Sequence, residues 1–171
     1  MAIRLFRKAS GLVAVSGGGK AFVAVTPSSG TGVLPKGHGI AFADFDQNED
    51  EDIFAAMGGA VPGDKQVSHL FQNPGNRNAW VSLKLVGTHT NRAAIGASLH
   101  LTVLGPAGTS HICRTVSSGG PFASSPRLQH VGLGNATAIE RPEINWPGVE
   151  AARMLRLVPL RKLLTLQEPG K

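Results

Sequence analysis

The stretch Trp80-Val81-Ser82-Leu83-Lys84-Leu85 decides the fold class, because apolar and polar residues alternate along it. In an extended strand, successive side chains point to opposite faces. Val81, Leu83 and Leu85 therefore share one face, and Ser82 and Lys84 lie on the other. This is the pattern of a half-buried antiparallel strand.

Similar strand-like runs, separated by turn-forming residues, occur on both sides of this stretch. The 171 residues include 22 Gly and 11 Pro, and these residues cost about 1 and about 3 kcal/mol in a helix interior relative to Ala. Long helices are therefore not expected, and the chain is predicted to be all-β. The predicted strands are 21–26, 39–43, 53–56, 69–72, 80–85, 97–104, 111–116, 128–131, 139–146 and 162–167.

Turn signals divide the chain into three parts. Residues 1–20 are basic and then glycine-rich, and we expect a poorly ordered leader. The turn Asn73-Pro74-Gly75-Asn76 ends the second part, 21–76. Residues 78–168 are predicted to form an antiparallel β-sandwich. Its expected inward-facing side chains are Val81, Leu83, Leu85, Leu99, Leu101 and Ile144.

Targeting and membrane segments are not expected. No apolar run approaches the roughly 18 residues of a membrane helix. The apolar stretch 11–15 follows basic residues but is too short for a signal peptide.

Charge is distributed unevenly. There are 17 Lys and Arg against 11 Asp and Glu, and six of these acids lie within residues 44–52. The rest of the chain is thus diffusely basic. One interpretation is a solubilising surface, and the alternative is a module that binds polyanions such as nucleic acid or sulfated glycans. Nucleic acid is not the favoured partner, because dense basic blocks and aromatic residues are scarce.

The acidic stretch has the spacing of a calcium loop. Asp44, Asp46 and Asn48 place side-chain oxygens at positions one, three and five of the loop. The Asp50 carbonyl would take position seven and Asp52 position nine. Such oxygen ligands suit Ca²⁺, whereas zinc would call for Cys or His. An EF-hand is disfavoured, because its twelfth position would be Ala55.

A solvated acidic loop is the alternative interpretation, since most charge runs have no further role. Glu49 occupies the sixth position, where calcium loops use Gly for its positive φ. A residue with a Cβ is strained in that conformation. The residues alone leave both interpretations open.

Two resemblances extend this picture. Residues 42–54, Phe-Ala-Asp-Phe-Asp-Gln-Asn-Glu-Asp-Glu-Asp-Ile-Phe, resemble the calcium loop of FG-GAP/VCBS repeats, which form propeller blades. Asn48 and Glu49 replace the Asp-Gly that is usual there. Four later motifs occur in the order typical of the ASPIC/UnbV domain: Asn91-Arg92-Ala93-Ala94-Ile95-Gly96-Ala97, Ser118-Gly119-Gly120, Val131-Gly132-Leu133-Gly134 and Ile144-Asn145-Trp146-Pro147-Gly148.

The resemblance implies a blade-like propeller fragment over 21–76, followed by an ASPIC/UnbV-like β domain. It also implies an extracellular or cell-surface location and no established catalysis. We therefore expect a non-enzymatic β module for adhesion or protein recognition, with Ca²⁺ held by Asp44, Asp46, Asn48, Asp50 and Asp52. The protein or glycan partner is not identified by the sequence. A single blade-like unit leaves sheet edges unpaired, which favours self-association.

Catalytic constellations are not expected. No Gly-x-Ser-x-Gly turn is present to position a serine nucleophile. Cys113 is the only cysteine, and it is expected as a small buried apolar residue. Trp80 and Trp146 are expected as core anchors with satisfied indole N–H groups, rather than as surfaces for stacking sugars.

Overall fold

A computed structural model describes residues 6–8, 22–24, 30–32, 37–58, 61–63, 66–119, 126–149, 153–155 and 158–170. None of these residues is in a helix, so the described chain is all-β, as predicted. The chain divides into two compact units. One contains Met1–Pro74 and Pro121–Ala123, and the other contains Gly75–Gly120 and Ser124–Lys171.

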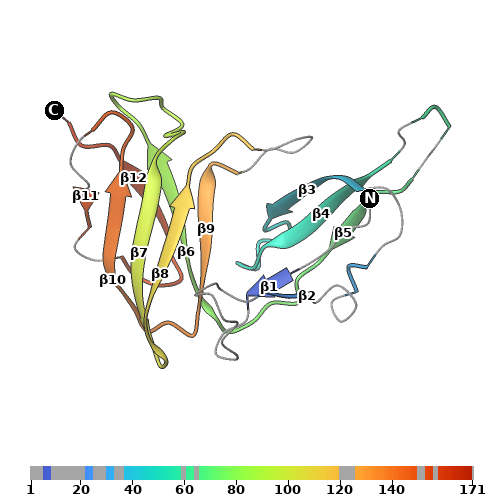
Figure 1. The fold of residues 1–171 in the computed structure, drawn as a ribbon, viewed down its shortest axis with the longest axis horizontal. Coiled ribbons are helices and arrows are strands. Elements are labelled where there is room, and N and C mark those ends of the chain that lie inside the picture. Colours follow the sequence, from blue (N-terminus) through green and yellow to red (C-terminus); the bar gives the residue numbers. More distant parts are fainter. Residues whose placement is uncertain are drawn as a thin grey trace. The chain divides into compact units, whose positions relative to one another are not determined.

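The first unit contains two small sheets (Figure 1). Strands β1 (Phe6–Lys8) and β2 (Phe22–Ala24) form an antiparallel pair. Within the expected leader 1–20, only the β1 residues are described. The second sheet has the order β3-β4-β5, with β3 spanning Gly37–Ala43, β4 Asp52–Met57 and β5 His69–Phe71.

The second unit contains a four-stranded and a three-stranded sheet (Figure 1). The four-stranded sheet has the order β11-β10-β7-β8 and the three-stranded sheet the order β12-β6-β9. The strands are β6 (Ala79–Val86), β7 (Ser98–Gly105), β8 (Gly108–Thr115), β9 (Leu128–Gly134), β10 (Ala138–Asn145), β11 (Arg153–Met154) and β12 (Leu163–Gln167).

One buried cluster joins side chains from both sheets of this unit. All six side chains predicted to face inward belong to it, with at most 4% exposure. Burying each of these aliphatic groups contributes about 1.5–3 kcal/mol. The alternation of Trp80–Leu85 thus identified the core face of β6 correctly.

Strand pairing departs from prediction at β12. This strand runs parallel to β6, with Leu164 opposite Leu83 and Gln167 opposite Val86. The other pairs of this unit are antiparallel. Parallel neighbours need a long crossover connection, and here the segment between β6 and β12 contains all the other strands of the unit.

Cys113 also differs from expectation, because it is exposed and not buried. It lies on β8, where Ile112 packs against the core. Successive side chains alternate between faces, so Cys113 points away from the core. Alternation was recognised correctly at this strand, but the wrong face was assigned to the cysteine.

Candidate functional site

The predicted site is the acidic loop between β3 and β4. β3 ends at Ala43 and β4 begins at Asp52, so residues 44–51 connect two antiparallel strands. The Asp44 carboxylate accepts hydrogen bonds from the backbone N–H of Asn48 at 2.9 Å and of Glu49 at 3.0 Å. Asp side chains commonly close turns in this way. Asp44 therefore folds the loop back on itself.

Asp46 and Asn48 continue this internal network. Asp46 Oδ1 accepts from the Asn48 N–H at 3.3 Å, and Oδ2 accepts from Asn48 Nδ2 at 3.0 Å. Gln72 Nε2 also donates to Asp46. Asn48 Oδ1 accepts from the Asp50 N–H at 2.9 Å. The side-chain oxygens predicted to bind calcium thus also hold the loop's backbone.

Asp52 is the buried member of the predicted ligand set, with 1% exposure. Its Oδ2 accepts from the Phe45 N–H at 3.0 Å, and its Oδ1 accepts from the Asn73 N–H at 2.7 Å. Charge-assisted bonds of this kind compensate a buried carboxylate. Asp52 therefore ties the acidic loop to the segment that follows β5.

The chemistry of these side chains suits a hard cation, because all the predicted ligands are oxygens. Each carboxylate oxygen has two lone pairs, so an oxygen that accepts one hydrogen bond still has room for a metal. Asp46 Oδ2 already accepts two, from Asn48 and Gln72, which leaves Oδ1 as the available oxygen of Asp46. Within the described part of the chain, no group of three or more His, Cys, Asp or Glu residues is arranged to hold a metal ion. The ligand set remains a prediction.

Two loop residues with side chains adopt left-handed backbone conformations. Glu49, at the sixth loop position, has φ 75°, and Gln47 has φ 60°. This conformation costs a residue with a Cβ roughly 1–2 kcal/mol. The strain expected from Glu49 in place of Gly is therefore present in the folded loop.

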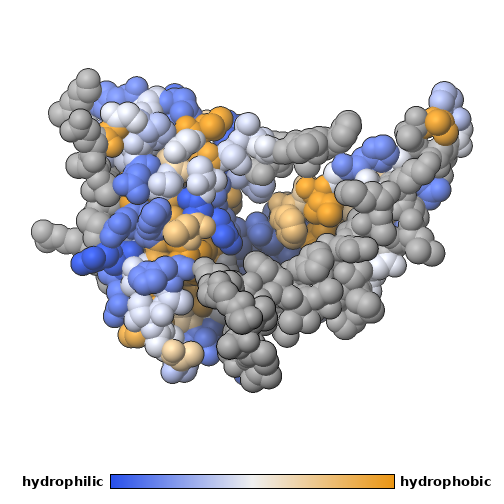
Figure 2. Space-filling view, viewed as in Figure 1, coloured by the Kyte–Doolittle hydropathy of each residue, from blue (hydrophilic) through white to orange (hydrophobic). Residues whose placement is uncertain are grey.

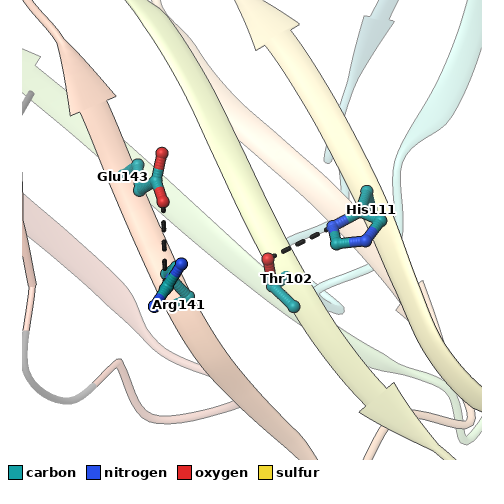
Figure 3. A network of polar contacts seen from close by, with 4 residues as sticks. All are labelled: Thr102, His111, Arg141 and Glu143. Carbon is teal, nitrogen blue, oxygen red and sulfur yellow. Dashed lines mark hydrogen bonds and ion pairs between the residues drawn. The ribbon is translucent and has the colours of Figure 1, made fainter.

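A polar surface lies on the four-stranded sheet. Arg141, Thr102 and His111 form one row across β10, β7 and β8, and Glu143, His100 and Cys113 form the next. Figure 3 shows the contacts between Arg141 Nε and Glu143 Oε1 at 4.0 Å and between Thr102 and His111 at 3.2 Å. These residues line a cavity of about 250 Å³. Sequence spacing missed the cluster because its members come from three strands.

Ser82 and His130 form a second pair that sequence spacing missed. Ser82 Oγ lies 2.9 Å from His130 Nδ1, and the His130 ring stacks on Trp80 at a centroid distance of 5.3 Å. Ser82 is only 4% exposed. A serine nucleophile must be accessible to its substrate, and this hydroxyl is not. The Ser82–His130 contact instead joins the neighbouring strands β6 and β9.

Glu168 is a buried acid that no sequence motif indicated. It follows β12 and is 3% exposed. Its Oε2 accepts from the backbone N–H groups of Thr88 at 2.8 Å, His89 at 2.9 Å and Thr90 at 3.0 Å. The Thr90 hydroxyl donates to the same oxygen at 3.0 Å. Glu168 therefore fastens the turn after β6 to the end of β12.

These bonds change the acidity of Glu168. Burial raises its pKa, but the backbone N–H groups of Thr90, His89 and Thr88 and the Thr90 hydroxyl outweigh burial. Together they lower the pKa from 4.5 to about 2. The ionised form is thus the one that the folded turn stabilises.

Two of the sequence motifs meet in space beside this turn. Gly96 has φ 95°, and a Cβ at this position would lie 3.2 Å from Pro147 Cγ. The Asn91 side chain closes the same loop, since its Oδ1 accepts from the Ile95 N–H at 2.7 Å. Trp146 is buried as expected, but its Nε1 has no hydrogen-bond partner among the residues that the structure describes, contrary to expectation.

These features define an all-β protein with several sheets and buried carboxylates that organise its turns. Residues 87–171 match the family model described as ASPIC and UnbV. The chain is therefore similar to ASPIC and UnbV proteins over nearly half its length, which confirms that resemblance. No curated protein matches the chain.

Replacing Glu49 by Gly should stabilise the first unit. Gly adopts a positive φ without steric cost, so we expect the free energy of unfolding to rise by about 1 kcal/mol. Urea denaturation measures this change. Glu49→Ala is the matched control, because it removes the same charge but keeps the Cβ. An equal rise in the free energy of unfolding in both variants would show that the lost charge causes the effect, and would contradict backbone strain at Glu49 as its cause.

Acidification should destabilise the second unit through Glu168. A carboxyl group with a lowered folded-state pKa contributes stability above its unfolded pKa and loses it as pH falls through the folded value. We expect the melting temperature to fall between pH 4.5 and about 2. Glu168→Gln should melt lower at neutral pH and lose much of this pH dependence. A variant with an unchanged pH profile would show that other carboxylates cause the loss.

Proposed function

We propose that this chain is a non-enzymatic, extracellular or cell-surface β module for adhesion or protein recognition, with an acidic loop stabilised by one calcium ion. The observation that carries the recognition role is the apolar surface of the β3-β4-β5 sheet. Its exposed side chains include Ile40, Phe42, Phe54 and Leu70, each 37–45% exposed, and the neighbouring Phe45 is 72% exposed. Clustered exposed apolar groups mark interaction surfaces.

Both faces of this sheet contribute to the apolar surface. Phe54 pairs with Leu70 and with Ala41, so these side chains share one face. Ile40 and Phe42 lie on the other face, opposite Ala55 and Ile53. Figure 2 shows hydrophobic side chains on the surface of this sheet. A blade-like unit that packs against further sheets would have this pattern, and it supports the proposed propeller-fragment origin of residues 21–76.

Self-association through sheet edges is part of this proposal. In the described part of the chain, β3 and β5 each pair with β4 alone. An edge strand offers unpaired backbone groups to a second copy of the chain. The core-forming sheets of the second unit are proposed to form a β-sandwich, supported by the buried cluster that they share.

Calcium has a structural and not a chemical role in the proposal. Asp44, Asp46, Asn48 and Asp52 supply side-chain oxygens and Asp50 its carbonyl. The carboxylates repel one another across a short loop, and a divalent cation offsets that repulsion. In this proposal the partner binds through the exposed apolar side chains and the strand edges of the β3-β4-β5 sheet, and no catalysis is involved. None of the described residues forms a helix that is long and apolar enough to cross a membrane.

Calcium should raise the melting temperature of the protein. At a hundred times its dissociation constant, a ligand that binds only the folded state adds about 2.7 kcal/mol of stability. Asp44→Ala should abolish the difference between calcium and chelator, and the exposed Glu140→Ala should preserve it. The calcium loop is falsified if millimolar calcium leaves the wild-type melting temperature unchanged. Salt-sensitive heparin retention in that case would favour the polyanion-binding alternative.

Sedimentation velocity should show concentration-dependent association of the wild-type chain. Leu70→Lys places a charge on the exposed surface of edge strand β5, where lysine opposes strand pairing, and we expect it to remain monomeric. Leu104→Lys is the matched control, because Leu104 is also exposed, at 36%, but lies on β7, an interior strand of its sheet. Identical, concentration-independent sedimentation of all three proteins would contradict the edge contact.

A further inference from the structure

We propose that the cavity beside Glu168 binds an organic cation, an ammonium or guanidinium group at the end of an aliphatic stem. The cavity belongs to the second unit and lies where the turn after β6, the segment after β10 and the segment after β12 come together. The cavity does not involve the acidic loop. A failure of the cation-binding proposal can therefore be distinguished from a failure of the calcium proposal.

The two carboxylate oxygens of Glu168 have different surroundings. All four hydrogen bonds that the Thr88–Thr90 turn gives to the Glu168 carboxylate end on Oε2. Oε1 is buried and accepts no hydrogen bond from the residues that the structure describes. A buried acceptor without a donor destabilises the folded state, and more so when the group is charged. A hydrogen-bond donor placed beside this oxygen would therefore stabilise the folded turn.

A cavity of about 360 Å³ lies next to Glu168. The described residues that line it with Glu168 include His89, Thr90, Pro147, Val149 and Pro169. This volume falls within the roughly 300–1,000 Å³ of small-molecule sites. A water molecule occupies about 30 Å³ of liquid, so the cavity accommodates much more than the single water that Oε1 lacks.

The lining favours a cation with an aliphatic stem. Pro147, Val149 and Pro169 provide apolar walls, while Glu168 provides a negative charge. Lysine and arginine combine these two properties, since their methylenes pack on apolar surface and their heads are charged. Among the described residues that line the cavity there is no Lys or Arg. The described chain therefore does not neutralise its own buried carboxylate here.

A cation fits this oxygen better than a neutral donor does. Charge-assisted hydrogen bonds are roughly twice as strong as neutral ones. The four donors on Oε2 keep the carboxylate ionised, and a cation in the cavity would supply the donor that Oε1 lacks. The turn already holds Glu168 in one position, so binding requires little further ordering of the carboxylate.

Titration calorimetry on the intact chain tests this site with three probes of similar size. n-Butylammonium and n-butylguanidinium carry the charge, and n-butanol is the neutral control. We expect saturable binding of at least one cation, at least tenfold tighter than that of n-butanol. N-acetyl-lysinamide, which carries a lysine side chain, is a fourth probe. Tighter binding of this probe than of n-butylammonium would indicate a side chain of a protein as the source, and weaker binding would indicate a free amine.

Two variants locate the binding. Glu168→Gln removes the charge and should weaken cation binding at least tenfold. Because Glu168 also fastens the turn, Val149→Phe is a second variant: Val149 is 41% exposed and lines the cavity, so the larger ring should block the probes without removing a turn contact. Glu140→Gln, which removes an exposed acid outside the lining, should bind as the wild type does. Equal binding of butanol and the cations, full binding in Val149→Phe, or no binding at tens of millimolar would overturn the proposal.

Discussion

The parallel pairing of β12 with β6 is the constraint on which the second unit depends. Parallel strands end at the same edge of a sheet, so the residue after β12 arrives beside the turn after β6. Gln167 lies opposite Val86, and the Glu168 N–H donates to the Val86 carbonyl at 2.8 Å. A one-residue slip would turn the strand's side chains to the other face and remove the Glu168 carboxylate from the turn. Register, turn closure and cavity are thus consequences of one pairing.

Sequence reasoning succeeded where the information is local. Alternation in Trp80–Leu85 placed Val81, Leu83 and Leu85 in the core, and the same rule located β7 and β10 within a residue or two. It failed where the information is distant in sequence. The direction of β12 depends on a partner about 80 residues earlier, and alternation alone does not distinguish a parallel from an antiparallel neighbour. The exposure of Cys113 was missed for a related reason, because alternation separates two faces without saying which one is covered.

In the acidic loop, too, contacts between neighbouring residues were predictable and contacts with distant residues were not. Its spacing predicted a tight, oxygen-rich turn, and the bonds from Asp44 to the N–H groups of Asn48 and Glu49 form such a turn. The bond from Asn73 to Asp52 spans 21 residues and was not predictable from spacing. Asp52 was predicted only as a metal ligand, yet it also joins two segments of the unit. The oxygens predicted to bind a metal are the ones that close the loop, so the local pattern could not separate the two roles.

Asp52 and Glu168 are two solutions to the same physical problem. Each is a nearly fully buried carboxylate, at 1% and 3% exposure, and each is compensated by backbone N–H groups. Asp52 uses both oxygens, one for each segment that it joins. Glu168 concentrates all four donors of its turn on Oε2, and among the described residues Oε1 has no donor. Each oxygen of Asp52 thus has one donor from the protein, whereas Glu168 fastens its turn through one oxygen and keeps the other able to accept a hydrogen bond from a ligand.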